Sequence, residues 1–246
     1  MKKKIIIIAM TLMLVGSGQV MAVPQYTITD LGTLGGSTSY ANGINNSGQV
    51  VGYSYPTGVV EGGMNAHAFL YDGATMIDLG TLGGNGSIAR GINDSGQVVG
   101  HSYLPGHSGQ YHAFLYSGGV MQDLGTLGGT HSVANSINDS GQVVGGSHTT
   151  GDRDQRAFLY SDGVMQDLGT IGGTSTASGI NASGQVVGGS NGHAFLYSGG
   201  VMQDLDTLGG MYSDATGIND SGQVIAIVEN LVDLLHSYIA NTLSMK

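Results

Sequence analysis

Short runs in which apolar and polar residues alternate occupy most of the chain. In residues 112–116 (HAFLY), the larger side chains fall on one face and Ala113 and Leu115 on the other, which is the period of two that marks a β-strand. The glycine-rich residues 117–119 then predict a tight turn, and residues 120–124 return as the second strand of a hairpin. The pattern therefore predicts an all-β protein made of hairpins.

Three short strings recur along the chain in a fixed order, about 40 to 48 residues apart. DLGTLGG or a near copy begins at Asp30, Asp78, Asp123, Asp167 and Asp204. Ile-Asn-x-Ser-Gly-Gln-Val begins at Ile44, Ile92, Ile137, Ile180 and Ile218. Ala-Phe-Leu-Tyr begins at Ala68, Ala113, Ala157 and Ala194. Repetition of this length indicates a propeller, a solenoid or another stacked array.

The Asn-x-Ser-Gly string predicts a type I turn that closes a hairpin. Asn93 takes the first position and Gly96 the fourth, where the backbone has to adopt a left-handed conformation. Three copies have aspartate at the second position, but Asn46 and Ala182 replace it in the others. Because that carboxylate is dispensable, turn formation explains the motif better than a metal site does.

Two hairpins per repeat give four short antiparallel strands, which is the content of one propeller blade. We therefore expect a β-propeller-like repeat of about five four-stranded blades, with the last blade split between the termini. Residues 26–31 would supply its fourth strand and residues 215–227 its first two. The alternative is a β-solenoid or an open array of stacked hairpins. Helical spacing of apolar residues in 230–243 predicts an amphipathic helix with Asn230 as its N-cap.

The recurring HAFLY at His67, His112 and His193, with GIN-x-SGQVVG and DLGTLGG between copies, resembles the HAF-repeat family of predicted extracellular bacterial proteins. The resemblance covers residues 30–224. Arg156 stands in place of histidine in the third copy, and Asp206 in place of glycine in the fifth. The resemblance implies export, and it implies no activity or catalytic residue.

The N-terminus itself predicts export. Three lysines precede an apolar run at residues 5–15, and small residues follow up to Ala22, as in a cleaved secretory signal peptide. The run is far shorter than the ~20 residues that span a bilayer. We expect three segments: a signal peptide at 1–22, a repeat domain at 23–228 and a divergent tail at 229–246. The mature protein would be extracellular, periplasmic or on the cell surface.

Composition limits the partners. The chain has 45 glycines among 246 residues, no cysteine, and a formal net charge of −10. Only four basic residues follow the predicted signal peptide, so a nucleic-acid partner is disfavoured. We expect no disulfide, no membrane span and no cofactor, and a glycan or a protein as the extracellular partner.

Almost every polar residue belongs to a repeated string, and no catalytic motif stands out, so we expect no enzymatic activity. The copies differ mainly in the loops near residues 53–65, 101–110 and 148–155. Loops that vary on a rigid repeat scaffold are suited to binding. The predicted binding residues are Tyr55, Tyr103, His107, Tyr111 and Arg153. A purely structural surface array, or a fragment of a larger protein, is the alternative; a hydrolase at a propeller mouth is a third possibility.

Histidines at one repeated position could suggest a shared metal site. Equivalent residues of neighbouring repeats are, however, usually too far apart for common ligation, and Arg156 interrupts the series. We expect His67, His112 and His193 to form local hydrogen bonds instead. The acidic loop that contains Asp152 is also interrupted by arginines, so we expect a solvated loop and no metal.

Overall fold

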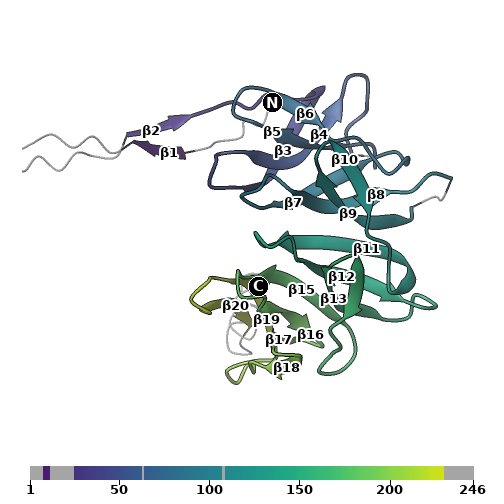
Figure 1. Ribbon diagram of the computed structural model, residues 1–246, viewed down its shortest axis with the longest axis vertical. Helices are drawn as coiled ribbons and strands as arrows, with labels where there is room; N and C mark the ends of the chain where they lie inside the picture. The colour runs from purple at the N-terminus through teal and green to yellow at the C-terminus, as the bar shows by residue number, and fades with distance from the viewer. Residues whose placement is uncertain (1–7, 12–24, 63, 107–108, 230–246) are drawn as a thin grey trace, which may run out of the picture.

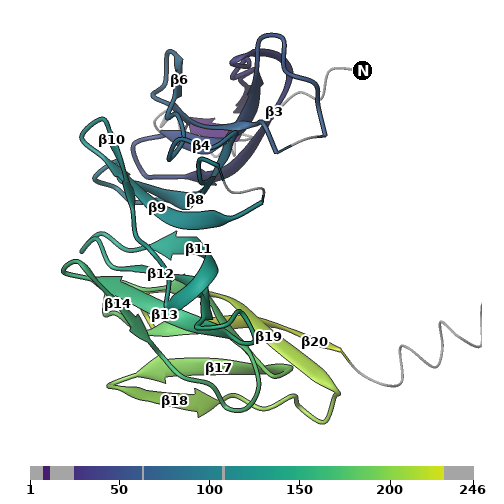
Figure 2. The same cartoon turned by 90° about the vertical axis from the view of Figure 1, so that its right-hand side faces the viewer.

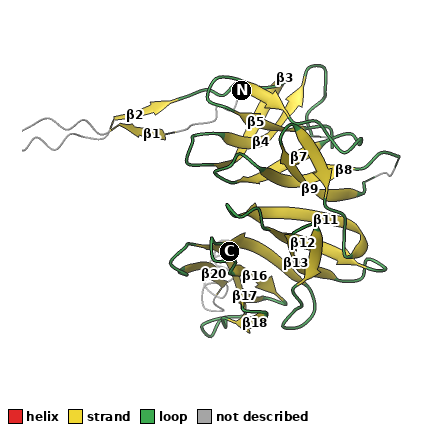
Figure 3. Ribbon diagram, in the orientation of Figure 1, coloured by secondary structure: helices red, strands yellow, loops and turns green. Residues whose placement is uncertain are grey.

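The protein consists of β-strands and connecting loops. The computed structural model describes residues 8–11, 25–62, 64–106 and 109–229, and no helix occurs among them (Figure 3). The all-β prediction is therefore confirmed. The strands are β1 (Ile8–Thr11), β2 (Gln25–Ile28), β3 (Gly35–Ile44), β4 (Val50–Pro56), β5 (His67–Tyr71), β6 (Met76–Asp78), β7 (Ser87–Ile92), β8 (Val98–Tyr103), β9 (Tyr111–Ser117), β10 (Val120–Asp123), β11 (Gly128–Ile137), β12 (Val143–Thr149), β13 (Gln155–Ser161), β14 (Val164–Asp167), β15 (Ser175–Ile180), β16 (Val186–Ser190), β17 (His193–Ser198), β18 (Val201–Asp204), β19 (Tyr212–Ile218) and β20 (Val224–Glu229).

Each repeat forms one antiparallel unit whose strands pair in chain order. Units 1 to 4 are β3–β6, β7–β10, β11–β14 and β15–β18, and unit 5 is the hairpin β19–β20. A parallel pairing of Tyr111 with His131 joins the sheets of units 2 and 3. The units follow one another down the molecule in Figures 1 and 2. The expected order of two hairpins per repeat is present in all four complete units.

The predicted turn is present in every unit. In unit 2, the amide of Gly96 donates to the carbonyl of Asn93 at 3.0 Å, and Gly96 has a φ of +77°. The side-chain oxygen of Asn93 also accepts from the amide of Gln97 at 2.9 Å. Sequence therefore predicts this element correctly, because the turn depends on its own four or five residues.

The hydrophobic core lies between successive units. The phenylalanines of the third strands, Phe69, Phe114, Phe158 and Phe195, are fully buried. Phe114 belongs to a cluster with Val51 of unit 1, and Phe158 to a cluster with Val99 of unit 2. Burial of apolar surface between neighbours, at roughly 25 cal/mol per Å², is thus the main attraction that holds adjacent units together.

A glycine lets the first two strands of each unit approach closely. A Cβ atom on Gly100 of β8 would overlap the carbonyl oxygen of Ile88 on β7. Gly52, Gly145 and Gly188 occupy the same position in the other complete units, and the same overlap arises there. The glycine of each Val-Val-Gly segment is therefore required by packing.

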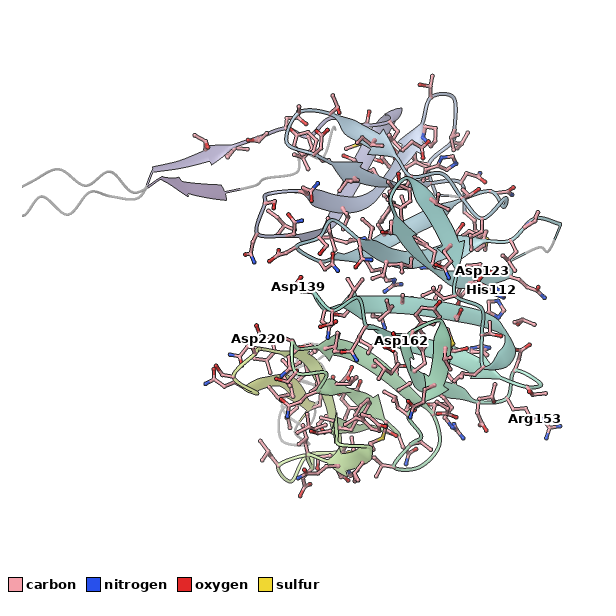
Figure 4. All side chains as sticks on the ribbon, viewed as in Figure 1. His112, Asp123, Asp139, Arg153, Asp162 and Asp220 are labelled. Atoms are coloured by element: carbon pink, nitrogen blue, oxygen red, sulfur yellow. The ribbon has the colours of Figure 1, made fainter. Side chains whose placement is uncertain are left out.

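The repeated turns and the variable loops lie at opposite edges of the units. In Figure 4, Asp139 and Asp220 of the turns lie on the left, whereas Arg153 of a variable loop lies on the right. A hollow of about 200 Å³ is lined by turn residues from all five units, including Asn45, Asn93 and Asn138. The turns therefore converge on a common centre.

The expected closing blade is not formed. Strand β2 pairs with β1 and extends away from the units in Figure 1, while β19 pairs only with β20. The prediction that residues 26–31 join residues 215–227 is therefore wrong. Ile225 is 67% exposed, although the corresponding Val99 is fully buried, because no described strand covers β20. The predicted helix at 230–243 lies outside the described residues.

Candidate functional site

A row of aromatic and imidazole rings runs across units 2 and 3 at the edge that carries the variable loops. We call it the aromatic row; it consists of His101, Tyr103, Tyr111, His131 and His148. The ring centroids of Tyr103 and Tyr111 lie 5.7 Å apart in a T-shaped arrangement. Tyr111 lies 4.5 Å from His131, which lies 5.2 Å from His148. The rings thus form a continuous series that no single repeat could form.

Strand pairing explains why these rings meet. His101 and Tyr103 are two residues apart on β8, so they point to the same face. Tyr103 pairs with Tyr111 of β9, and Tyr111 with His131 of β11. His131 and His148 then flank a pair of serines on adjacent strands. The row therefore depends on the junction between units 2 and 3.

His101 is the most buried member of the row, with 6% of its surface exposed. Its Nδ1 atom has no hydrogen-bond partner. Burial, together with the positive charge of Arg90, lowers the pKa of His101 to about 4. The ring is therefore neutral near pH 7. Burial and the neighbouring Tyr111 raise the pKa of Tyr103, so its hydroxyl group remains protonated and able to donate.

A shallow hollow of about 380 Å³ lies beside Tyr103. Met64 comes from the preceding unit, and Pro105 and Gly109 come from the loop that connects β8 to β9. Asn85 and the adjacent Gly83 and Gly84 also line the hollow and carry polar groups. The hollow thus combines an aromatic wall with hydrogen-bonding groups, as ligand-binding sites commonly do.

The structure brings together only part of the predicted binding set. Tyr103 and Tyr111 are in contact and half-buried. Tyr55 is buried within unit 1, where its hydroxyl accepts from the amide of Gly62 at 3.3 Å. Arg153 lies on the exposed turn after β12 and points away from the body in Figure 4. His107 lies outside the described residues.

The recurring histidines form local pairs, as the sequence predicts. Nδ1 of His112 lies 2.9 Å from Asp123, eleven residues later in the same unit, and the two are neighbours in Figure 4. Burial raises the pKa of Asp123, but the hydrogen bonds from His112 and from the amide of Gly125 outweigh this effect, so the pKa is lower than its ordinary value. His67 and His193 pair in the same way with Asp78 and Asp204. Their recurrence indicates a role in holding the β-strands and the following loop together.

Three members of the site were missed in the sequence. His101, His131 and His148 lie at positions where the repeats differ, so no repeated string marks them. His131 and His148 also lie close to Asp152, and the three ligand atoms fall within 4.8 Å of one another. Hydrogen bonds from the amide and hydroxyl of Thr130 lower the pKa of Asp152. The sequence led us to expect a solvated acidic loop around Asp152; the structure places two imidazoles beside this carboxylate.

A scan against models of protein families finds no match, and a search of curated proteins also finds none. Among the described residues, no helix is long and apolar enough to cross a membrane.

Proposed function

We propose that the protein is a non-catalytic binding module that recognises an uncharged glycan with the aromatic row. The observation that carries the proposal is the contact between Tyr103, which lines the hollow, and Tyr111. Both rings are half-buried, so they are held in place while part of each remains accessible. A pre-organised aromatic surface binds with a smaller loss of conformational entropy than a mobile one.

Aromatic rings with a polar end suit sugars. The face of a tyrosine ring packs against the apolar C–H face of a pyranose, while its hydroxyl bonds to the sugar hydroxyls. Asn85 adds an amide that both donates and accepts at the hollow. The formal net charge of −10 disfavours acidic sugars, which would be repelled. An uncharged oligosaccharide is therefore the partner that fits this surface best.

Three further parts of the proposal come from the sequence. Residues 1–22 act as a cleaved signal peptide, and the resemblance to HAF repeats agrees with export. The units form a propeller-like arc, which the convergence of five turns on one hollow supports.

Intact-mass measurement of the exported protein tests whether residues 1–22 are removed. We expect a mature chain that begins at Val23, and retention of Met1 would contradict the proposed signal peptide.

A glycan array, followed by calorimetry on the best-bound uncharged oligosaccharide, tests the binding proposal. Tyr103→Ala and Tyr111→Ala should each weaken binding about 5- to 30-fold, since each removes stacking worth about 1 to 2 kcal/mol. Tyr212→Ala is the matched control, because Tyr212 is an exposed tyrosine of unit 5 outside the row. Unchanged affinity in both row variants would reject this site. Capture of a protein, with no glycan bound, would identify a protein-binding module instead.

A further inference from the structure

We infer that His131, His148 and Asp152 form a binding site for a divalent transition metal, with Zn²⁺ as the ion whose preferences fit best. This inference does not rest on the glycan proposal, although two of the ligands, His131 and His148, also belong to the aromatic row. The three residues lie at the end of the aromatic row, on strands β11 and β12 and the turn that follows β12. Two imidazole nitrogens and one carboxylate are a common protein ligand set for zinc, with a fourth position left for water.

The separation of the donor atoms supports this site. Nδ1 of His148 lies 3.4 Å from Oδ1 of Asp152, which is longer than a good N–H···O hydrogen bond. Two ligands bound tetrahedrally at about 2.1 Å from one ion are themselves about 3.4 Å apart. All three ligand atoms lie within 4.8 Å of one another, so small side-chain movements would complete the geometry.

An unsatisfied atom also points to a ligand. Nδ1 of His148 is inaccessible to solvent and has no hydrogen-bond partner. A buried polar atom that stays without a hydrogen bond destabilises the folded state. A metal ion between His148 and Asp152 would use the lone pair of this nitrogen.

Thr130 holds the other two ligands in position. Its hydroxyl lies 2.7 Å from Nδ1 of His131 and 2.9 Å from Oδ2 of Asp152, and its amide donates to Oδ1 at 2.7 Å. Hydrogen bonds of this kind orient metal ligands in many proteins. When the ion binds, His131 would exchange its bond to Thr130, or the contact of Nε2 with the carbonyl of Gly109, for the metal.

The other histidine–aspartate pairs lack these features. His67, His112 and His193 lie 2.8 to 2.9 Å from their aspartates, which is hydrogen-bond distance. Within the described residues, only the cluster at His131, His148 and Asp152 brings three potential ligands together. Imidazole nitrogen favours zinc over calcium, which binds oxygen ligands.

The test is titration of the full-length protein with Zn²⁺ by calorimetry, and with Co²⁺ followed by visible absorption. We expect one equivalent to bind, with the intense absorption of tetrahedral Co²⁺. His148→Asn and His131→Thr introduce the residues that unit 4 has at these positions, Asn191 and Thr174. Each should weaken binding at least about tenfold, as loss of a ligand or of its support does.

His112→Asn is the matched control, since it removes a histidine that pairs with one aspartate only. Metal affinity should stay at the wild-type value in this variant. Asp152→Asn, on an exposed turn, provides a second test if a histidine variant does not fold. The inference is overturned if the wild-type protein binds no Zn²⁺, if folded variants of all three ligands keep full affinity, or if His112→Asn loses it equally.

Discussion

The repeated turns and the aromatic row lie at opposite edges of the same units, and they differ in how their polar groups are satisfied. At the turns, each asparagine amide donates to the backbone of the next unit: Asn45 to Asn93, Asn93 to Asn138, Asn138 to Asn181, and Asn181 to Asn219. We call this series the turn ladder. At the other edge, His101 and His148 each have a buried nitrogen with no hydrogen-bond partner.

The contrast holds throughout the described part of the chain. Its buried side-chain polar atoms without a hydrogen-bond partner belong to Thr38, His101, His148 and Asp214. None of the four belongs to a repeated string. The repeated residues therefore satisfy one another and maintain the stacking of units, whereas the buried polar atoms without a hydrogen-bond partner belong to residues that vary.

Substitutions of two adjacent glycines should give the largest difference in the free energy of unfolding between a repeated and a varying position. Gly145 belongs to the repeated Val-Val-Gly, and a Cβ there would overlap the carbonyl oxygen of Val133. Gly145→Ala should therefore lower the free energy of unfolding by about 3 kcal/mol, the upper part of the usual range for overpacking. Gly146 occupies a position that holds Tyr53 in unit 1, and its Cβ would meet the flexible end of Gln155 and, less closely, the Cγ2 methyl of Thr176. Gly146→Ala should cost less than about 1 kcal/mol in urea unfolding, and equal costs would contradict the distinction.

Acid should weaken the protein through His101. The unfolded histidine binds a proton below about pH 6.5, but the folded one only below about pH 4. Between these values the unfolded state binds more protons, so stability falls as the pH falls. The loss should be on the order of 2 to 3 kcal/mol by about pH 4.

The contribution of His101 is isolated by comparing the free energy of unfolding of the wild-type protein and of His101→Tyr at each pH. Tyrosine is chosen because Tyr53 occupies the same position in unit 1. Urea unfolding across this pH range should show a steeper loss of stability in the wild-type protein. Parallel pH dependences of the two proteins would mean that His101 is protonated equally in the folded and unfolded states.

Each asparagine of the turn ladder should contribute more to the free energy of unfolding inside the array than at its C-terminal end. Asn138 is buried and donates to Asn181 at 3.1 Å as well as to Gln142 at 2.8 Å. Asn138→Ala should cost about 2 kcal/mol, because buried groups lose their partners. Asn219 makes the same local bonds but is exposed. Asn219→Ala should cost roughly half as much in thermal or urea unfolding, and a reversed order would contradict the ladder.

The smallest effect concerns the uncovered strand. Val99→Ala should cost about 2 kcal/mol, since Val99 is fully buried against unit 3. Ile225→Ala should change stability by less than about 0.5 kcal/mol, because Ile225 is 67% exposed. A cost for Ile225→Ala as large as for Val99→Ala, measured by urea unfolding, would show that something covers this face in solution.

Local features of the fold could be predicted from the sequence, and distant ones could not. The turn at Asn93 and the hairpin before Val120 depend on a few adjacent residues, so propensity and spacing suffice. The prediction of a closing blade was wrong because it required residues 26–31 to pair with residues 215–227. Repetition in the sequence does not determine how many units complete a ring. Pairing of β2 with β1 was also not foreseen, because residues 8–11 were interpreted only as part of a leader.

The same difference between local and distant contacts explains why only part of the site was predicted. Tyr103 and Tyr111 flank one loop, so their meeting follows from a single hairpin. The approach of His131 to Tyr111 depends on a pairing between two units, and that of His148 to Asp152 on the shape of an irregular turn. The repeats indicate where the copies differ, but the register between units decides which of the differing residues meet.

Glycan affinity of one variant tests most directly whether the varying positions carry the function. Tyr103→Asn, Tyr111→Gln, His131→Thr and His148→Asn together replace four of the five row residues with the residues that units 3 and 4 have at the same positions. Circular dichroism should show that the repeat fold is kept, because every substituted residue already occurs in an equivalent place. We expect this variant to lose binding to the oligosaccharide that the wild-type protein binds best. Wild-type affinity in the folded variant would contradict the account.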